Sequence, residues 1–281
     1  MRRPAVYLAS SVTLISLCGC QALQRLSNWG TSFTSPHTTP TKGAEAILST
    51  PPTLLEPAKS PLNPLSQSSQ TGCRKELDMP KELVATAHYS NYGERLKKDR
   101  WGRTLAGNPR IIVLHETALG TTDTIRLFQT AHPRDEDQVS YHLIIDRDGS
   151  IHRIVPDAKR AYGAGMSAFG DVTQRSKPGA VGSINNIALH ISLSSPNDGL
   201  NDKDSHSGYT EMQYKRLASQ VLLWQGAYGI PLTRVTTHAA VDRSHSRYDP
   251  RSFRWDQFDK HYREAASRCG WQHLDNQQAG V

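Results

Sequence analysis

Two histidines and one aspartate have the residue types and the spacing that could hold a metal ion. His115 and His238 each follow a short segment of strand-like composition, and Asp249 comes eleven residues after His238. Imidazole nitrogens and a carboxylate oxygen are common ligands of tetrahedral zinc, and three protein ligands leave the fourth position for water. The chain contains 12 histidines, and a single histidine is more often an ordinary hydrogen-bonded residue than a ligand. The spacing alone therefore leaves two interpretations open, a zinc site and a set of unrelated residues.

The segments before the two histidines have the composition of β-strands. Residues 110–114 read Arg-Ile-Ile-Val-Leu, which is typical of a strand buried on both faces, and they end at His115. Residues 234–237 are rich in β-branched side chains and end at His238. A third run, residues 187–193, predicts another strand. Because side chains at the ends of neighbouring strands converge, these strands could bring the two imidazoles together.

A hairpin is predicted in the middle of the chain. Residues 141–145 and 151–155 are two apolar runs, and Asp148-Gly149 lies in the turn between them. Asp-Gly favours a tight turn because glycine readily adopts a positive φ. We therefore expect an antiparallel pair of strands here.

Helices alternate with these strands. Thr210 and Gln213 form a capping box at the start of a helix that Gly229 ends, and residues 253–268 predict a final amphipathic helix. Thr122 could cap a shorter helix. This alternation predicts an α/β protein with a mixed β-sheet in a single folded domain.

The N-terminus has the pattern of an export signal. Two arginines precede an apolar run, residues 5–17, that is too short for a stable membrane span. The run ends in Leu-Cys-Gly-Cys, which resembles the lipobox of bacterial lipoproteins, with residues 1–19 as signal peptide and Cys20 as the lipidated residue. Gln21, rather than Asp, follows the cysteine, which predicts the periplasmic face of an outer membrane. A plain secretory signal with a coincidental cysteine is the alternative.

Residues 20–72 are expected to form a disordered tether. They are rich in Ser, Thr and Pro and contain few aromatic residues, so they cannot bury enough apolar surface to offset their chain entropy. Its Ser-, Thr- and Pro-rich part, about residues 27–71, reaches roughly 35–40 Å as a flexible chain. The folded domain is then expected at residues 73–281, with its core at about 108–268.

Two cysteines remain after the signal peptide and Cys20 are set aside. Cys73 and Cys269 lie on opposite sides of the predicted core, and an exported protein meets an oxidising compartment. We predict that they form a disulfide, and two free thiols are the alternative.

The charge pattern speaks against nucleic acid and nucleotide as partners. The net charge is +7, from 33 Lys and Arg against 26 Asp and Glu, but the basic residues are scattered. The sequence contains neither a GxGxxG loop nor a Walker-type loop.

Several of these segments, in this order and spacing, resemble the zinc-dependent N-acetylmuramoyl-L-alanine amidases of the peptidoglycan recognition fold. The resemblance covers about residues 108–258 and depends on the following blocks: residues 113–117, 141–149 and 209–213, Thr237-His238 and Asp249-Pro250. It implies a central mixed β-sheet flanked by helices, and one Zn²⁺ held by His115, His238 and Asp249. It also implies hydrolysis of the amide between N-acetylmuramic acid and L-alanine in peptidoglycan or muropeptides.

The resemblance also suggests catalytic residues, and here the chain departs from the family. Many members carry a glutamate as general base where this chain has His190, which could do the same work or be an ordinary strand residue. Tyr141 matches a tyrosine used in proton transfer or transition-state binding. Arg247 stands in place of a lysine and keeps a positive charge that could stabilise an oxyanion. Glu116 and His142 are expected to be structural.

The predicted substrate groove departs from the family as well. Residues 162–165 read Tyr-Gly-Ala-Gly where relatives often have Trp-His-Ala-Gly, so Tyr162 and Gly165 are candidates for substrate binding and Gly163 removes a possible contact. The loop of residues 165–183 could rebuild the groove wall or be solvated packing.

Three functions follow from these observations. The first is a membrane-tethered zinc amidase in cell-wall remodelling or recycling. The second is a non-catalytic peptidoglycan-binding module of the same fold, because the usual glutamate and lysine are missing. The third is a zinc hydrolase that acts on a different amide.

Overall fold

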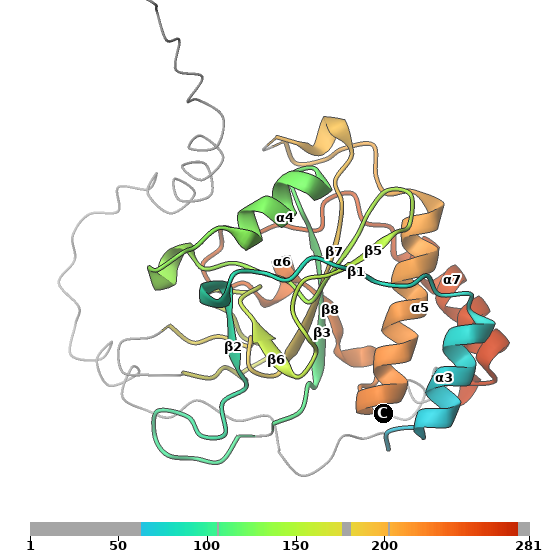
Figure 1. Cartoon of the computed structure of the whole chain (residues 1–281), viewed down its shortest axis with the longest axis horizontal. Coiled ribbons are helices and arrows are strands. Elements are labelled where there is room, and N and C mark those ends of the chain that lie inside the picture. The colour runs from blue at the N-terminus through green and yellow to red at the C-terminus, as the bar shows by residue number, and fades with distance from the viewer. Residues whose placement is uncertain (1–62, 106, 176–180, 202, 275–281) are drawn as a thin grey trace, which may run out of the picture. The chain divides into compact units, whose positions relative to one another are not determined.

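The computed structural model describes residues 63–105, 107–175, 181–201 and 203–274 (Figure 1). The predicted signal peptide, Cys20 and most of the predicted tether lie outside these residues. No helix in the described ranges combines the length and the apolar character needed to cross a bilayer.

The core of the described chain is a six-stranded mixed sheet with the strand order β1-β5-β4-β7-β3-β8. All neighbouring pairs are parallel except β4 and β5, which form the hairpin predicted from Asp148-Gly149. Gly149 in that turn has a φ of 86°. The strand bounds are β1 Leu83–Val84, β3 Ile111–Glu116, β4 Leu143–Ile145, β5 Ile151–Arg153, β7 Ala188–Leu193 and β8 Val235–Thr237. A separate antiparallel pair consists of β2 (Tyr92–Glu94) and β6 (Lys159–Ala161).

The two central strands are buried along their whole length. Every residue of β3 and β7 is buried, as the apolar runs in the sequence predict. Their side chains alternate between the two faces of the sheet. On the first face of the sheet, Ile112 and Leu114 pack into a core that is shared mainly with helices. On the second face, Ile111 and Val113 pack into another core that is shared mainly with loops. His115 lies on the same face of β3 as Val113.

Helices cover the first face of the sheet. α5 (Glu211–Tyr228) and α7 (Trp255–Cys269) pack against each other, and α3 (Gln67–Glu76) packs against both (Figure 1). The capping box predicted at Thr210 is present at the start of α5, and Gly229 ends this helix in the left-handed conformation. The mixed sheet with helices packed on it confirms the predicted α/β class.

The remaining helical segments are short. α4 is Thr121–Gln129 and α6 is His238–Val241. The prediction that Thr122 caps the first of these was wrong: the N-cap is Gly120, and Thr121 is already the first helical residue. The 3-10 helices are Tyr89–Asn91, Asp135–Asp137, Asn197–Gly199, Leu232–Arg234 and Gln272–Leu274.

The folded region begins earlier than the sequence predicted. α3 includes residues 67–72, which we assigned to the tether. Ser66 caps this helix by accepting a hydrogen bond from the Ser69 backbone, and Cys73 and Leu77 are buried against α5 and α7. The polar composition of residues 67–72 resembles a linker, and only the packing of the helix that contains them shows that they belong to the domain.

The structure joins Cys73 to Cys269 by a disulfide, as we predicted, with the two Cα atoms 4.9 Å apart. The bond connects α3 to the last residue of α7. It therefore links the two ends of the folded region across 196 residues of sequence.

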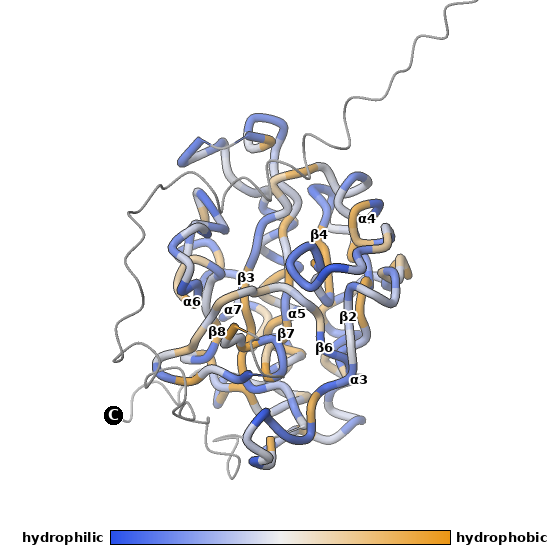
Figure 2. Tube along the Cα trace, turned by 90° about the vertical axis from the view of Figure 1, so that its left-hand side faces the viewer, coloured by the Kyte–Doolittle hydropathy of each residue, from blue (hydrophilic) through white to orange (hydrophobic). Residues whose placement is uncertain are grey.

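The hydropathy of the chain follows this architecture. In Figure 2 the hydrophobic colour is concentrated in the central strands, whereas the outer loops are mostly hydrophilic. His115 near the end of the buried strand β3 and His238 after the half-buried strand β8 therefore place polar ring atoms at the border of an apolar core.

Candidate metal site

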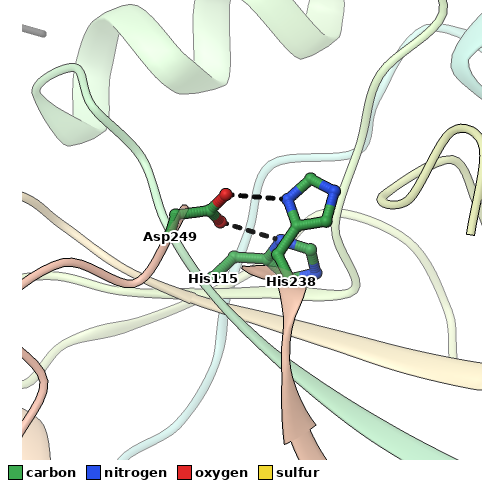
Figure 3. Close-up of side chains that lie close together, drawn as sticks. All are labelled: His115, His238 and Asp249. Carbon is green, nitrogen blue, oxygen red and sulfur yellow. Dashed lines mark ion pairs between the residues drawn. The ribbon is translucent and has the colours of Figure 1, made fainter. Parts of the chain in front are cut away.

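Three elements bring the predicted ligands together. His115 is the second-last residue of β3, His238 begins α6 directly after β8, and Asp249 lies in the loop before α7. Since β3 and β8 are parallel neighbours, their C-terminal ends meet at one edge of the sheet. One ligand atom from each of the three residues lies within 4.8 Å of the others, and Figure 3 shows the carboxylate facing both rings.

The Asp249 carboxylate contacts the Nδ1 atoms of both histidines. The distance is 3.3 Å from Oδ2 to His115 and 2.9 Å from Oδ1 to His238. His115 Nδ1 is buried and makes no geometrically acceptable hydrogen bond within the described residues. The two nitrogens and the carboxylate can supply three ligands of a tetrahedral metal ion, and a water can supply the fourth. In the described part of the chain, the His115 nitrogen makes no hydrogen bond that would compete with the metal. The residues present therefore fit a metal ion such as zinc.

The protonation states also suit a cation. Burial lowers the pKa of His115 to about 4, although the nearby Asp249 carboxylate acts in the opposite direction. Burial alone would raise the pKa of Asp249, but the charge of His238 and the close approach of both histidine rings hold it well below its usual range. At neutral pH the site thus offers a neutral His115 imidazole and an ionised carboxylate, which are the forms that bind metals.

Tyr141 lies directly against the first histidine. Its ring stacks on His115 with centroids 4.4 Å apart and an interplanar angle of 27°, and Phe128 meets the tyrosine ring edge-on. Burial raises the pKa of Tyr141, and Asp249 raises it further. The phenol is therefore a protonated group at the site, able to donate a hydrogen bond.

His190 is not placed to face a bound substrate. It is fully buried on β7, and its Nδ1 is 2.9 Å from Nε2 of His115, on the side of that ring away from Asp249. Its other nitrogen, Nε2, is also buried. A general base must reach the reacting proton directly or through one water, and neither nitrogen of His190 is exposed for this purpose.

His142 extends this arrangement, in agreement with the structural role expected for it. Its ring stacks on that of His190 at 5.8 Å, and its Nδ1 accepts a hydrogen bond from the His190 backbone. His115 on β3, His190 on β7 and His142 directly before β4 lie side by side on one face of the sheet, and we call them the histidine row. Burial lowers the pKa of His142 and that of His190 well below the usual value, so the row is neutral.

Arg247 lies near the site in a loop organised by Asp242. The Asp242 carboxylate accepts hydrogen bonds from the backbones of Ser244, Ser246 and Arg247. Burial and Asp249 raise the pKa of Tyr141, and the positive charge of Arg247 counteracts them. The structure thus places a cation within electrostatic range of the predicted reaction centre.

The two predicted substrate-binding residues make no hydrogen bond with the three ligands in the described structure. The Tyr162 backbone donates to Ser140, and its hydroxyl is 3.4 Å from Arg160. Gly165 is exposed, with no atom within 4 Å of an added Cβ. The following loop packs against the His238 segment, where Ala168 donates to the Val241 carbonyl. Lys177 of this loop lies outside the described residues.

Sequence reasoning missed the partner of Glu116. The Glu116 carboxylate is buried and pairs with the Arg251 guanidinium, and it accepts hydrogen bonds from Tyr209 at 2.7 Å and from His206 at 2.9 Å. We call these four residues the Glu116 cluster. Arg251 also donates to three carbonyls of the 199–203 segment. Because Arg251 follows Asp249 by two residues, the cluster fixes the ligand-bearing loop to β3.

Arg95 is a second buried arginine that the sequence did not single out. Its guanidinium donates to the carbonyls of Asp157, Asn186 and Ala188 at distances of 2.7 to 3.2 Å. It thereby holds the start of β7, the strand that carries His190. No local pattern in the sequence signals these contacts, because the partners are 62 to 93 residues away.

The family of the chain follows from a match to a family model. Residues 105–252, more than half of the chain, match the model described as N-acetylmuramoyl-L-alanine amidase, Amidase_2. The matched range contains all three ligand residues. The protein belongs to this amidase family.

Solved structures of amidases are similar to the chain. A selenomethionine derivative of AmpD has 22% identity and a TM-score of 0.46, covering 65% of this chain and 95% of that one. AmpD from Citrobacter freundii has 24% identity and a TM-score of 0.41, covering 64% and 89%. AmiD from E. coli, in complex with anhydro-N-acetylmuramic acid-L-Ala-D-γ-Glu-L-Lys, has 19% identity and a TM-score of 0.42, covering 57% and 60%. No curated protein gives a significant match.

Proposed function

We propose that this protein is a zinc-dependent N-acetylmuramoyl-L-alanine amidase that acts on peptidoglycan or muropeptides in cell-wall remodelling or recycling. The family match supports the class of reaction. The observation that carries the metal requirement is the convergence of His115, His238 and Asp249, whose donor atoms lie within 4.8 Å of one another. AmiD of E. coli, a similar structure, was solved with an anhydromuropeptide substrate.

The chemistry divides between the metal and the chain. A zinc ion held by these ligands would lower the pKa of a bound water to about 7 and polarise the amide carbonyl. The protein orients the ligands: Tyr141 stacks on His115, and Asp249 is held by its loop. The Tyr141 hydroxyl can donate to a developing oxyanion, and Arg247 supplies positive charge near it.

The test is zinc-dependent release of stem peptide from purified peptidoglycan by the full chain. We expect release that disappears with a chelator, returns when Zn²⁺ is added back, and is absent in His238→Ala. A matched control is His273→Ala, an exposed histidine outside the ligand set. Release that survives both the chelator and His238→Ala would contradict the proposal. A panel of defined muropeptides and simple peptides separates this substrate from a different amide.

The placement of His190 favours one alternative, a peptidoglycan-binding module without catalysis. The position of the expected general base is taken by a histidine whose nitrogens are both buried. The alternative predicts that the protein binds zinc and sediments with peptidoglycan but releases no stem peptide.

We further propose that the protein is exported and anchored through lipid at Cys20, on the membrane face that adjoins the cell wall. The lipobox-like sequence supports this proposal. Radiolabelled palmitate should enter the wild-type protein and move it to the membrane fraction. Cys20→Ala should abolish both, and a Cys20→Ala protein that still fractionates with membranes would contradict the anchor.

A further inference from the structure

His190 and Gly163 are two departures from the family pattern that prove to be in contact. A Cβ added to Gly163 would lie 2.5 Å from Nδ1 and 2.6 Å from Cγ of His190. Real Cβ atoms do not approach ring atoms this closely, and both residues are buried. The imidazole of His190 can therefore lie where it does only because residue 163 has no side chain.

The same ring contacts the metal ligand His115 on the side away from the ligand set. In a hydrogen bond between two neutral imidazoles, one nitrogen donates and the other accepts. If His115 presents the lone pair of Nδ1 to a metal, its proton is on Nε2, and this N–H points at His190 Nδ1, 2.9 Å away. His190 must then carry its own proton on Nε2.

An acceptor behind a metal-binding imidazole fixes the tautomer and the orientation of the ring. Carboxylates, carbonyls and waters are the usual acceptors, and here the acceptor is a second imidazole. The backbone of His190 is fixed in turn by its hydrogen bond to His142, and its strand lies between β3 and β4.

We propose that His190 is a positioning residue that holds His115 in the metal-binding tautomer, and that Gly163 is required because it leaves room for the His190 ring. This inference rests on the proposed zinc site and assigns His190 a role other than proton transfer to substrate. It also means that the two departures from the family pattern, His190 and Gly163, depend on each other.

The first experiment measures zinc affinity by competition with a chelator, using the purified full chain. His190→Leu removes the acceptor and should weaken zinc binding about 10- to 100-fold, the usual effect of losing such a partner. His190→Asn places an amide oxygen near the position of Nδ1 and should restore most of the affinity. Equal zinc affinity in the wild type and His190→Leu would overturn the proposal.

The second experiment tests the contact with Gly163. Gly163→Ala should weaken zinc binding and lower the thermal midpoint of the metal-free protein by about 5 °C. In a His190→Ala background the same substitution should cost almost nothing, because the ring that it meets is gone. Gly165→Ala is the matched control, since no atom lies within 4 Å of its added Cβ. An equal cost of Gly163→Ala in both backgrounds would overturn the proposed contact.

These measurements separate this inference from the proposed function. If the wild-type protein binds no zinc, both fail. If zinc binds and His190→Leu leaves its affinity unchanged, only the positioning role fails. If the expected affinity pattern appears but no stem peptide is released, the positioning role stands and the amidase activity fails.

Discussion

Two adjacent residues of β3 lead into regions of opposite character. His115 joins the histidine row, in which the buried imidazoles are neutral because burial lowers their pKa values. Glu116 points to the other face and joins the Glu116 cluster, where a buried carboxylate is paired with Arg251. One strand thus carries a ligand of the proposed metal site and, one residue later, the carboxylate of a buried ion pair.

This difference separates function from support. A ligand set must leave lone pairs available, and His115 Nδ1 has no hydrogen bond among the described residues. A structural ion pair must satisfy its groups, because an unpaired buried charge is costly. The Glu116 carboxylate accordingly has three partners, and Arg251 binds three further carbonyls. We expect substitutions in the first region to affect activity and those in the second to affect stability.

The largest effect on activity is expected from replacing His115, the proposed metal ligand in the histidine row. His115→Gln should reduce stem-peptide release by at least about 1000-fold, because a metal contributes several kcal/mol to catalysis and each 1.36 kcal/mol is a factor of ten. The measurement is the initial rate of release at saturating Zn²⁺, with circular dichroism as a check of folding. A folded variant that retained a tenth of the wild-type rate would contradict the assignment of His115.

The next largest effect is expected from breaking the ion pair of the Glu116 cluster. Glu116→Leu should lower the free energy of unfolding by about 3–5 kcal/mol, because it leaves the Arg251 guanidinium buried without its carboxylate. Urea unfolding measures this loss. The double variant Glu116→Leu/Arg251→Met should recover part of it. A loss below about 1 kcal/mol would show that the Glu116 cluster does not support the loop.

A smaller effect is expected from the cation near the site. Arg247→Met should lower kcat about 100-fold with little change in KM, if its charge acts on the oxyanion of the transition state. Arg247→Lys keeps the charge and should retain most of the activity. Steady-state kinetics on a muropeptide distinguishes these outcomes, and a change confined to KM would assign Arg247 to substrate binding instead.

The smallest effect uses another ion pair, in which Arg153 binds Glu82 at 2.8 Å. Burial would raise the pKa of Glu82, but the hydrogen bond and the charge of Arg153 outweigh it and hold the pKa below its usual value. A lowered folded-state pKa stabilises the protein above the unfolded pKa, and this contribution is lost as pH falls through the folded pKa. Glu82→Gln should therefore lower the thermal midpoint by about 2 °C at pH 7 and have little effect near pH 3. The same difference at both pH values would contradict this linkage.

The sequence predicted those features that have a local signal. The Asp148-Gly149 turn, the capping box at Thr210 and the buried run before His115 each depend on a few adjacent residues, and the structure confirms them. The ligand set was accessible because strand ends converge and because the motifs resemble a known family.

Long-range contacts had no such signal. The pairing of Glu116 with Arg251 spans 135 residues, and nothing near either residue marks the other. The helix at residues 67–76 is polar enough to resemble a linker, and only its tertiary contacts identify it as part of the domain. Likewise, His190 and Gly163 each departed visibly from the family pattern, but their contact appears only in the folded chain.

The link between α3 and α7 has a mechanical consequence. The chain that precedes the domain enters through α3, and Cys73 joins this helix covalently to Cys269 at the end of α7. A pulling force on the preceding segment would reach α7 through this bond, and α3 and α7 also pack on α5. The force would then be carried by α3, α5 and α7. It would not act directly on β3 and β8, which position His115 and His238.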